Sequence, residues 1–145
     1  MGDNSTSKST QGKSNRPIVI GLDFGTFSTK VLLRRRGDKE AELVQLDAPV
    51  EGYPWFANPS LVCLDRDRLY FGREASLKKT GIVFHSLKVR LLPPRLERDP
   101  ETDSFPVGLG PDCLVACYLG WALQRIKHLV PEVATSPVFL NVAAP

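Results

Sequence analysis

The stretch from residue 18 to residue 33 constrains the fold of this chain more than any other. It reads IVIGLDFGTFSTKVLL: a Val/Ile/Leu run reaches Asp23, breaks at Gly-Thr-Phe-Ser-Thr, and resumes as a second apolar run after Lys30. Short runs of β-branched and aliphatic residues bounded by turn-forming residues are typical of strands. The stretch therefore predicts two strands, at residues 18–22 and 30–34, joined by a short turn.

Further short elements are expected downstream. Residues 42–46 follow a Gly-Asp turn and predict a third strand, so the chain should open as an antiparallel meander. Residues 60–64 and 68–72 predict two more strands, and residues 73–79 predict a short helix. Residues 93–111 are rich in proline and in charge, which indicates a long surface loop.

A long helix is expected at residues 112–130. Asp112 can cap its first turn, and Pro131 cannot continue it, so both ends carry a signal. The apolar residues recur at helical spacing and predict one buried face: Leu114, Tyr118, Trp121, Ala122, Ile126 and Leu129. Residues 137–144 read PVFLNVAA, which predicts a buried strand after the helix.

Length and composition fit one folded domain. The chain has 145 residues, of which 42% are apolar and 24% charged, and its net charge of +3 comes from scattered basic residues. This charge distribution does not predict nucleic acid as a partner, and no apolar run reaches the roughly 18 residues of a membrane span. Cys63, Cys113 and Cys117 lie in apolar surroundings without metal-ligand spacing and predict buried thiols in a reducing cytoplasm.

The chain divides into a tail and a folded part. Residues 1–16 are almost wholly polar and predict disorder. Gly2 and Thr6 in this tail match an N-myristoylation pattern, which a segment rich in Ser and Thr also meets by chance. Residues 17–145 are expected to fold, with residues 48–111 as an inserted α+β subdomain. An end directly after a buried strand suggests a truncated chain.

The break between the first two strands has the chemistry of a phosphate and magnesium site. Gly25 adopts backbone conformations that other residues avoid, and it lets an anion approach the main chain closely. Asp23 ends the first strand, where its carboxylate can hold a hydrated Mg²⁺ through water. The neighbouring side chains supply hydroxyl and ammonium donors: Thr26, Ser28, Thr29 and Lys30. An ordinary hairpin with a glycine turn would use the same residues, so this site is a hypothesis.

Several segments resemble one protein family. The motif GLDFGTFSTKV resembles the first phosphate motif of the superfamily that joins actin, the sugar kinases and the seventy-kilodalton heat-shock chaperones. The segments NPSLVCLDRDRLYFGREA, FHSLKVRLL and SPVFLNVAAP are similar, in order, to the heat shock protein 70 family. The resemblance covers residues 17–145 and the first part of that family's ATPase domain. It implies an α/β fold of the ribonuclease H-like, actin-like ATPase type, whose N-terminal lobe has a mixed sheet that opens with an antiparallel meander.

The resemblance also assigns roles to individual residues. Asp23 takes the position of the carboxylate that holds magnesium through water. Gly25, Thr26 and Phe27 take the turn that surrounds the β- and γ-phosphates. Lys88 takes the position of the lysine that reaches the γ-phosphate and helps to orient the attacking water.

The sequence departs from the family pattern near these positions. Lys30 has a counterpart in actin and its bacterial relatives but none in the chaperones. Phe27 replaces a small or hydroxyl-bearing residue, which removes a side-chain donor. The segment before Lys88 is slightly longer than usual, and taken alone Lys88 also fits a surface lysine.

The family resemblance implies an ATP-binding lobe with ATP and Mg²⁺ as cofactors. Client polypeptides or co-chaperones would be partners of the full-length protein, and hydrolysis would require a C-terminal lobe. Two alternatives stay open. One is a sugar kinase of the same superfamily, and the other is a nucleotide-binding scaffold or actin-like protein without hydrolysis, which Phe27 favours.

Overall fold

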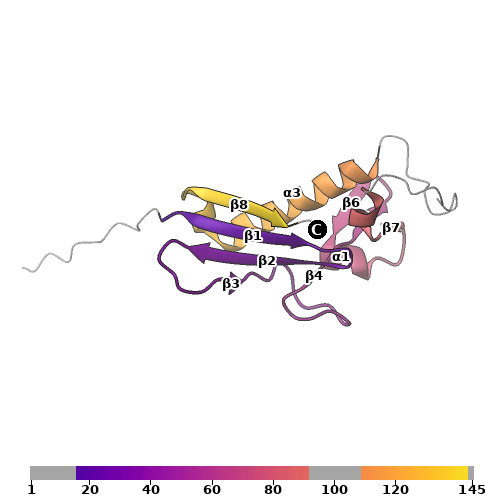
Figure 1. The fold of residues 1–145 in the computed structure, drawn as a ribbon. Coiled ribbons are helices and arrows are strands. Elements are labelled where there is room, and N and C mark those ends of the chain that lie inside the picture. Colours follow the sequence, from indigo (N-terminus) through magenta and orange to yellow (C-terminus); the bar gives the residue numbers. More distant parts are fainter. Residues whose placement is uncertain (1–15, 92–108, 144–145) are drawn as a thin grey trace, which may run out of the picture.

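The computed structural model describes residues 16–91 and 109–143, which form two sheets and one long helix (Figure 1). The strands are β1 (Ile18–Phe24), β2 (Ser28–Arg35), β3 (Glu42–Leu43), β4 (Asn58–Pro59), β5 (Val62–Asp65), β6 (Arg68–Phe71), β7 (Ile82–Phe84) and β8 (Val138–Ala143). The helices are α1 (Gly72–Leu77), α2 (Leu87–Arg90), α3 (Pro111–Leu129) and the short 3-10 helix η1 (Pro131–Ala134). Most of the predicted tail, including Gly2 and Thr6, lies outside the described residues, as does most of the predicted loop at 93–111.

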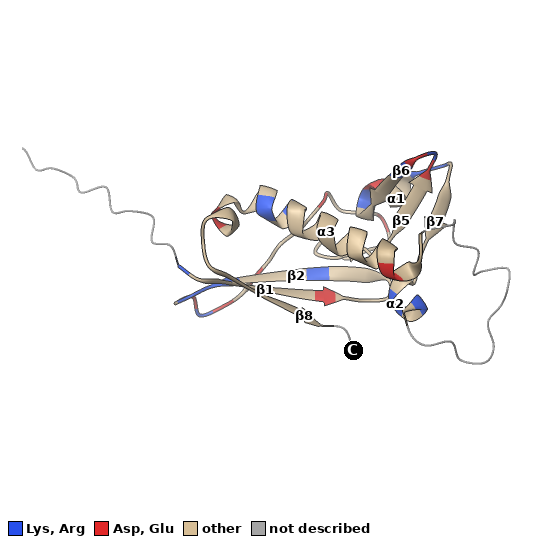
Figure 2. Ribbon diagram, turned by 90° about the horizontal axis from the view of Figure 1, so that it is seen from above, with Lys and Arg blue, Asp and Glu red and all other residues tan. Residues whose placement is uncertain are grey.

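The first sheet has the strand order β3-β2-β1-β8, and β4 also pairs with β2. The pairs β1–β2 and β2–β3 are antiparallel, which confirms the predicted opening meander, although β3 is shorter than expected. β8 runs parallel to β1. Parallel neighbours need a crossover connection, and α3 lies within it, against one face of the sheet (Figure 2).

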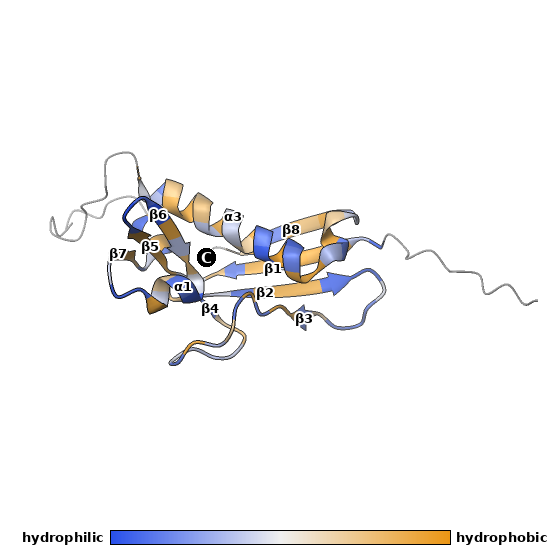
Figure 3. Cartoon of the chain, turned by 180° about the vertical axis from the view of Figure 1, so that it is seen from behind, coloured by the Kyte–Doolittle hydropathy of each residue, from blue (hydrophilic) through white to orange (hydrophobic). Residues whose placement is uncertain are grey.

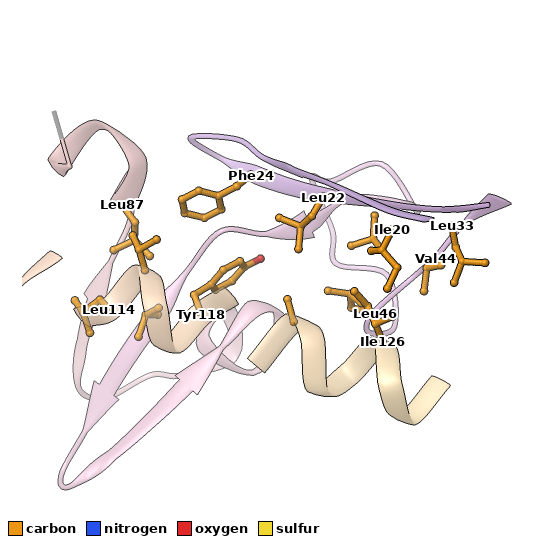
Figure 4. Packing of buried hydrophobic residues seen from close by; sticks show 14 of the residues in the cluster. Ile20, Leu22, Phe24, Leu33, Val44, Leu46, Leu87, Leu114, Tyr118 and Ile126 are labelled. Carbon is orange, nitrogen blue, oxygen red and sulfur yellow. The ribbon is translucent and has the colours of Figure 1, made fainter. Parts of the chain in front are cut away.

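Alternation along β1 explains why this strand forms and which face it buries. Ile18, Ile20, Leu22 and Phe24 are buried, whereas Val19 and Asp23 between them are exposed. Successive side chains of a strand point to opposite faces, so one face of β1 meets α3 and the other carries the acid. Figure 4 shows the inward side chains packed against α3.

α3 follows the predicted helical spacing, but Trp121 is only partly buried, Val115 is buried without having been predicted, and both ends of the helix differ. Its buried residues are Leu114, Val115, Tyr118, Ala122 and Ile126. The predicted cap is wrong: Gly110 is the N-cap residue without a side-chain bond, and Asp112 lies inside the first turn, where an acid still favours the helix dipole. Leu129 is 43% exposed, so the buried face ends before it.

The second sheet is antiparallel, with the order β6-β5-β7. β5 and β6 confirm the predicted hairpin, and α1 confirms the predicted short helix, whereas β7 was not predicted. Val62 and Phe84 of this sheet belong to the same hydrophobic cluster as Ile20 of the first sheet. The two sheets therefore share one core. The division of the chain into a lobe and an inserted subdomain stays a prediction.

β8 is exposed along its whole length, so the prediction of a buried strand is wrong. Figure 3 shows how apolar this strand is, and its exposed residues include Phe139 at 63% and Leu140 at 46%. The reason is its place at the end of the strand order, because α3 covers β1 and β2 instead. Within the described ranges, no helix is both long and apolar enough to cross a membrane.

Candidate functional site

The predicted site lies at the carboxyl end of β1, in the turn between Phe24 and Ser28. Asp23 is in register with Ala143 of β8, so the carboxyl ends of these two parallel strands lie at the same edge of the sheet. In open α/β sheets, ligands bind outside the carboxyl ends of parallel strands. The turn therefore lies where ligands bind in such sheets, and its residues are of the types that bind phosphate and magnesium.

Gly25 is required by a close approach of the main chain. Its N–H donates to the carbonyl oxygen of Ser28 over 3.1 Å, and a Cβ atom on Gly25 would lie 2.5 Å from that same oxygen. Gly25 is not among the residues with positive φ, so the predicted reason, an unusual backbone conformation, is wrong. The reason for glycine here is space.

Two backbone amides at the tip of this turn have no protein acceptor within the described residues. They belong to Thr26 and Phe27, whereas the Gly25 amide is used inside the turn. Successive backbone N–H groups at a turn form an anion-binding concavity. The turn can therefore offer two donors to a phosphate oxygen.

Opposite charges flank these amides on the exposed face of the sheet. Asp23 and Lys30 are register partners on β1 and β2, and both side chains are exposed. No ion pair joins them in the part of the chain that the structure describes. The ammonium of Lys30 lies 6.0 Å from the ring centroid of Phe56. Carboxylate and ammonium are thus both available to a ligand.

The hydroxyl-bearing residues of the turn divide into two groups. Thr29 is fully buried, with its Oγ1 2.9 Å from the Oγ of Ser60, so its side chain serves the interior and not a ligand. Thr26 and Ser28 are half-buried at the turn. Phe27 is 74% exposed, and its ring occupies the position where the family resemblance implied a further donor.

Magnesium at this turn would be held mainly by water and by phosphate oxygens. The described residues contain no group of three or more His, Cys, Asp or Glu that could hold a metal ion together. Mg²⁺ keeps several waters and needs only one or two carboxylates when a substrate phosphate is present. The lone carboxylate of Asp23 fits that requirement.

Lys88 lies in α2 and is half-buried. The preceding residue, Leu87, is fully buried in the core, and Figure 4 shows it beside Leu114 on the side of Phe24, the last residue of β1. α2 therefore lies at the same end of the sheet as the turn, as Figure 2 also shows. The approach of the Lys88 ammonium to a bound phosphate stays a prediction.

Tyr118 of α3 is a residue of this region that sequence reasoning missed. Its ring centroid lies 5.6 Å from that of Phe24, and its hydroxyl donates to the carbonyl oxygen of Pro59 over 3.1 Å. Burial raises the pKa of this phenol to about 12. Helical spacing marked Tyr118 only as an apolar core residue, and a hydroxyl on a buried helix face was the available signal.

Two other features of the molecule, a groove and the cysteine thiols, offer less to a charged ligand. A groove of about 1020 Å³ at the opposite end of the sheet is lined by Arg35, Glu42 and Glu132. Arg35 bonds to both glutamates, which raises the pKa of its guanidinium and engages this charge within the protein. Burial raises the pKa of Cys63 and of Cys117, so both thiols are protonated near neutral pH.

The sequence was also compared with known proteins. It matches no protein-family model and no curated protein. The family resemblance of the Asp23 to Lys30 motif therefore depends on the residues quoted for it, and the function has to be argued from the geometry of the turn.

Proposed function

We propose that this chain binds the phosphates of Mg-ATP at the turn between Asp23 and Lys30. It would act as the N-terminal lobe of an actin-like ATPase with a ribonuclease H-like fold, resembling the heat shock protein 70 family. One observation carries the proposal. Two unpaired backbone amides lie at the carboxyl end of β1, beside a carboxylate and an ammonium that face each other without pairing.

Each part of the turn has a role in this proposal. The amides of Thr26 and Phe27 donate to phosphate oxygens. Gly25 lets the turn that presents them close, because a Cβ there would lie 2.5 Å from the Ser28 carbonyl oxygen. Lys30 supplies a compact positive charge, and Asp23 holds the hydration shell of the metal. Mg²⁺, when bound, neutralises charge on the phosphates.

Hydrolysis requires more than this turn. Phosphoryl transfer depends on groups that surround the transferred phosphate and fix the attacking water in line. Lys88 is the candidate for stabilising charge that develops on the γ-phosphate. We expect a second lobe to close over the nucleotide, and client polypeptides or co-chaperones to be partners of the full-length protein.

A nucleotide-binding scaffold without hydrolysis is the second candidate, and one observation favours it. Phe27 presents a largely exposed ring at the tip of the turn, where a hydroxyl group would otherwise help to position a phosphate or a water. Both candidates bind nucleotide, so phosphate release by the full-length protein distinguishes them. We place either one in the cytoplasm, because Cys63, Cys113 and Cys117 are all free thiols.

A nuclear magnetic resonance titration of the ¹⁵N-labelled chain tests the proposal, because it detects weak binding residue by residue. Mg-ATP should shift the amide signals of Thr26 and Phe27. ATP with a chelator should shift them less, and Mg-AMP least, because AMP lacks the β- and γ-phosphates. Amides of the hairpin between β5 and β6 should stay unchanged.

Two exposed lysines provide a matched control. Lys30→Ala should weaken the Mg-ATP shifts, whereas Lys39→Ala removes another exposed charge outside the turn and should not. If Lys39→Ala reduces the Mg-ATP shifts as much as Lys30→Ala does, the nucleotide is attracted by the overall positive charge and not by a specific site. No shift at Thr26 or Phe27 at millimolar nucleotide would exclude the proposed site.

A further inference from the structure

A network of buried hydroxyl and amide groups lies directly beneath the turn and connects it to α3. We infer that Tyr118 is a positioning residue for this turn: its hydroxyl, acting through residues 58–60, holds the backbone at Phe27 and Thr29 in place. The consequence for nucleotide binding rests on the proposed function. The positioning of the turn backbone by Tyr118 is independent of that function.

Tyr118 contacts one end of the turn directly and the other end through β4. Its ring packs on Phe24, the residue before Gly25, with 5.6 Å between the ring centroids. Its hydroxyl donates to the carbonyl oxygen of Pro59 over 3.1 Å, and Pro59 is the register partner of Ser28 on β2. One side chain of α3 thus supports the end of β1 and, through β4, the start of β2.

Ser60 connects that support to the turn itself. Its N–H donates to the carbonyl oxygen of Phe27 over 3.0 Å, and its hydroxyl lies 2.9 Å from the hydroxyl of Thr29. Asn58 adds a bond from its Nδ2 to the carbonyl oxygen of Thr29 over 3.3 Å. These contacts fix the peptide group between Phe27 and Ser28 and the one between Thr29 and Lys30.

The network is buried, so its bonds are costly to leave unmade. Thr29, Asn58 and Ser60 are exposed by 0%, 2% and 1%, and Tyr118 by 0%. A buried carbonyl that loses its donor keeps the full cost of its lost hydration. The bond from the Tyr118 hydroxyl to the Pro59 carbonyl therefore keeps residues 58–60 against α3. Because the Ser60 amide bonds to the Phe27 carbonyl, the position of residues 58–60 sets the orientation of that carbonyl.

The hydroxyl adds no apolar packing that a phenylalanine would lack. The ring of Tyr118 contacts Phe24 and Trp121, and a phenylalanine ring would keep both contacts, so Tyr118→Phe isolates the effect of the hydroxyl. The amide of Phe27 belongs to the same turn as the carbonyl that Ser60 holds. A shift of α3 should therefore change the donors offered to phosphate, and phosphate binding should in turn restrain α3.

Amide hydrogen exchange of the full chain tests the inference without any ligand. The amides of Gly25 and Ser60 report directly, because they donate to Ser28 and to Phe27. In Tyr118→Phe, protection at these two amides should fall by about tenfold more than at amides of β5 and β6. Tyr70→Phe removes a hydroxyl from the second sheet and should leave Gly25 and Ser60 unchanged.

Each result decides the question. A selective loss at Gly25 and Ser60 supports the inference, whereas an even loss of protection over all amides overturns it, because a purely structural role lowers the stability of the whole fold. If Tyr118→Phe does not fold, Thr29→Val removes the hydroxyl at the other end of the network and Thr29→Ser keeps it. The same selective loss is then expected in Thr29→Val only.

Nucleotide binding separates this inference from the proposed function. Where the wild-type chain binds Mg-ATP, Tyr118→Phe should weaken the Thr26 and Phe27 shifts at a temperature at which both proteins are fully folded. A selective exchange result together with no binding by the wild type would refute the proposed function and leave the positioning role of Tyr118 in place.

Discussion

Asp23 and Lys30 are register partners on β1 and β2, both are exposed on the same face of the sheet, and they form no ion pair within the described chain. Opposite charges directly across a strand pair usually attract. Here they lie beside two unpaired backbone amides. A ligand that carries both a positive and a negative group could bind the carboxylate and the ammonium at the same time. A magnesium-bound phosphate has that chemistry, because its metal suits the carboxylate and its oxygens suit the ammonium.

Asp23→Asn should remove most of the magnesium dependence of nucleotide binding. A neutral amide holds a hydrated cation less well than a carboxylate does. Titrations with ATP in the presence and absence of Mg²⁺ measure the effect. Asp67→Asn is the control, because it neutralises an exposed acid in the turn between β5 and β6. An unchanged response to Mg²⁺ would exclude Asp23 from the site.

Gly25→Ala should distort the turn and weaken phosphate binding. The new Cβ would lie 2.5 Å from the Ser28 carbonyl oxygen, which is backbone and cannot move without the strand. We expect a loss of unfolding free energy of about 1–3 kcal/mol. Gly120→Ala on α3 meets nothing within 4 Å and should instead gain about 1 kcal/mol of helix propensity. Denaturant unfolding of both variants measures the contrast.

The longer elements were predictable from the sequence. Runs of β-branched and aliphatic residues between turn-forming residues identified β1 and β2, and helical spacing identified α3. Each of the three buries one face on a single core. β8 was placed correctly but assigned the wrong burial, since a run that is apolar throughout suits a strand covered on both faces. Whether a neighbour covers β8 is a tertiary property that its own residues do not encode.

The composition of the turn was predictable, but its support was not. Asp23, Gly25 and Lys30 stand within eight residues of one another, so a local motif identifies them. The partners Tyr118 and Pro59 are 59 residues apart and meet only once β4 pairs with β2. Short strands such as β4 carry too few residues for a periodic signal.

Ile126→Asp should destabilise the fold by several kcal/mol. Ile126 is fully buried between α3 and the first sheet, and a carboxylate there would have no partner. Leu129→Asp on the same helix is the matched control, because Leu129 is 43% exposed and should change stability by less than about 1 kcal/mol. Equal losses in thermal unfolding would show that the buried face of α3 is misplaced.

Tyr118 should make the stability of the fold depend on alkaline pH. Burial raises its pKa from 10.0 to about 12. Between these pH values the unfolded chain releases a proton that the folded chain retains, so stability falls as the pH rises through this window. The loss should reach about 2–3 kcal/mol. Urea unfolding of the wild type should show it, Tyr118→Phe should lack this component, and Tyr53→Phe should keep it.

The 145-residue chain on its own should bind Mg-ATP weakly and show no measurable turnover. Asp23, Phe27 and Lys30 are exposed to solvent, where water and salt screen individual phosphate contacts. Catalysis needs a closed cleft that excludes bulk water and fixes the attacking one, and the turn is open. Calorimetry with Mg-ATP and a phosphate-release assay measure both properties. Micromolar affinity with steady phosphate release would mean that this chain holds a complete active site, and the proposal of a single lobe would have to be abandoned.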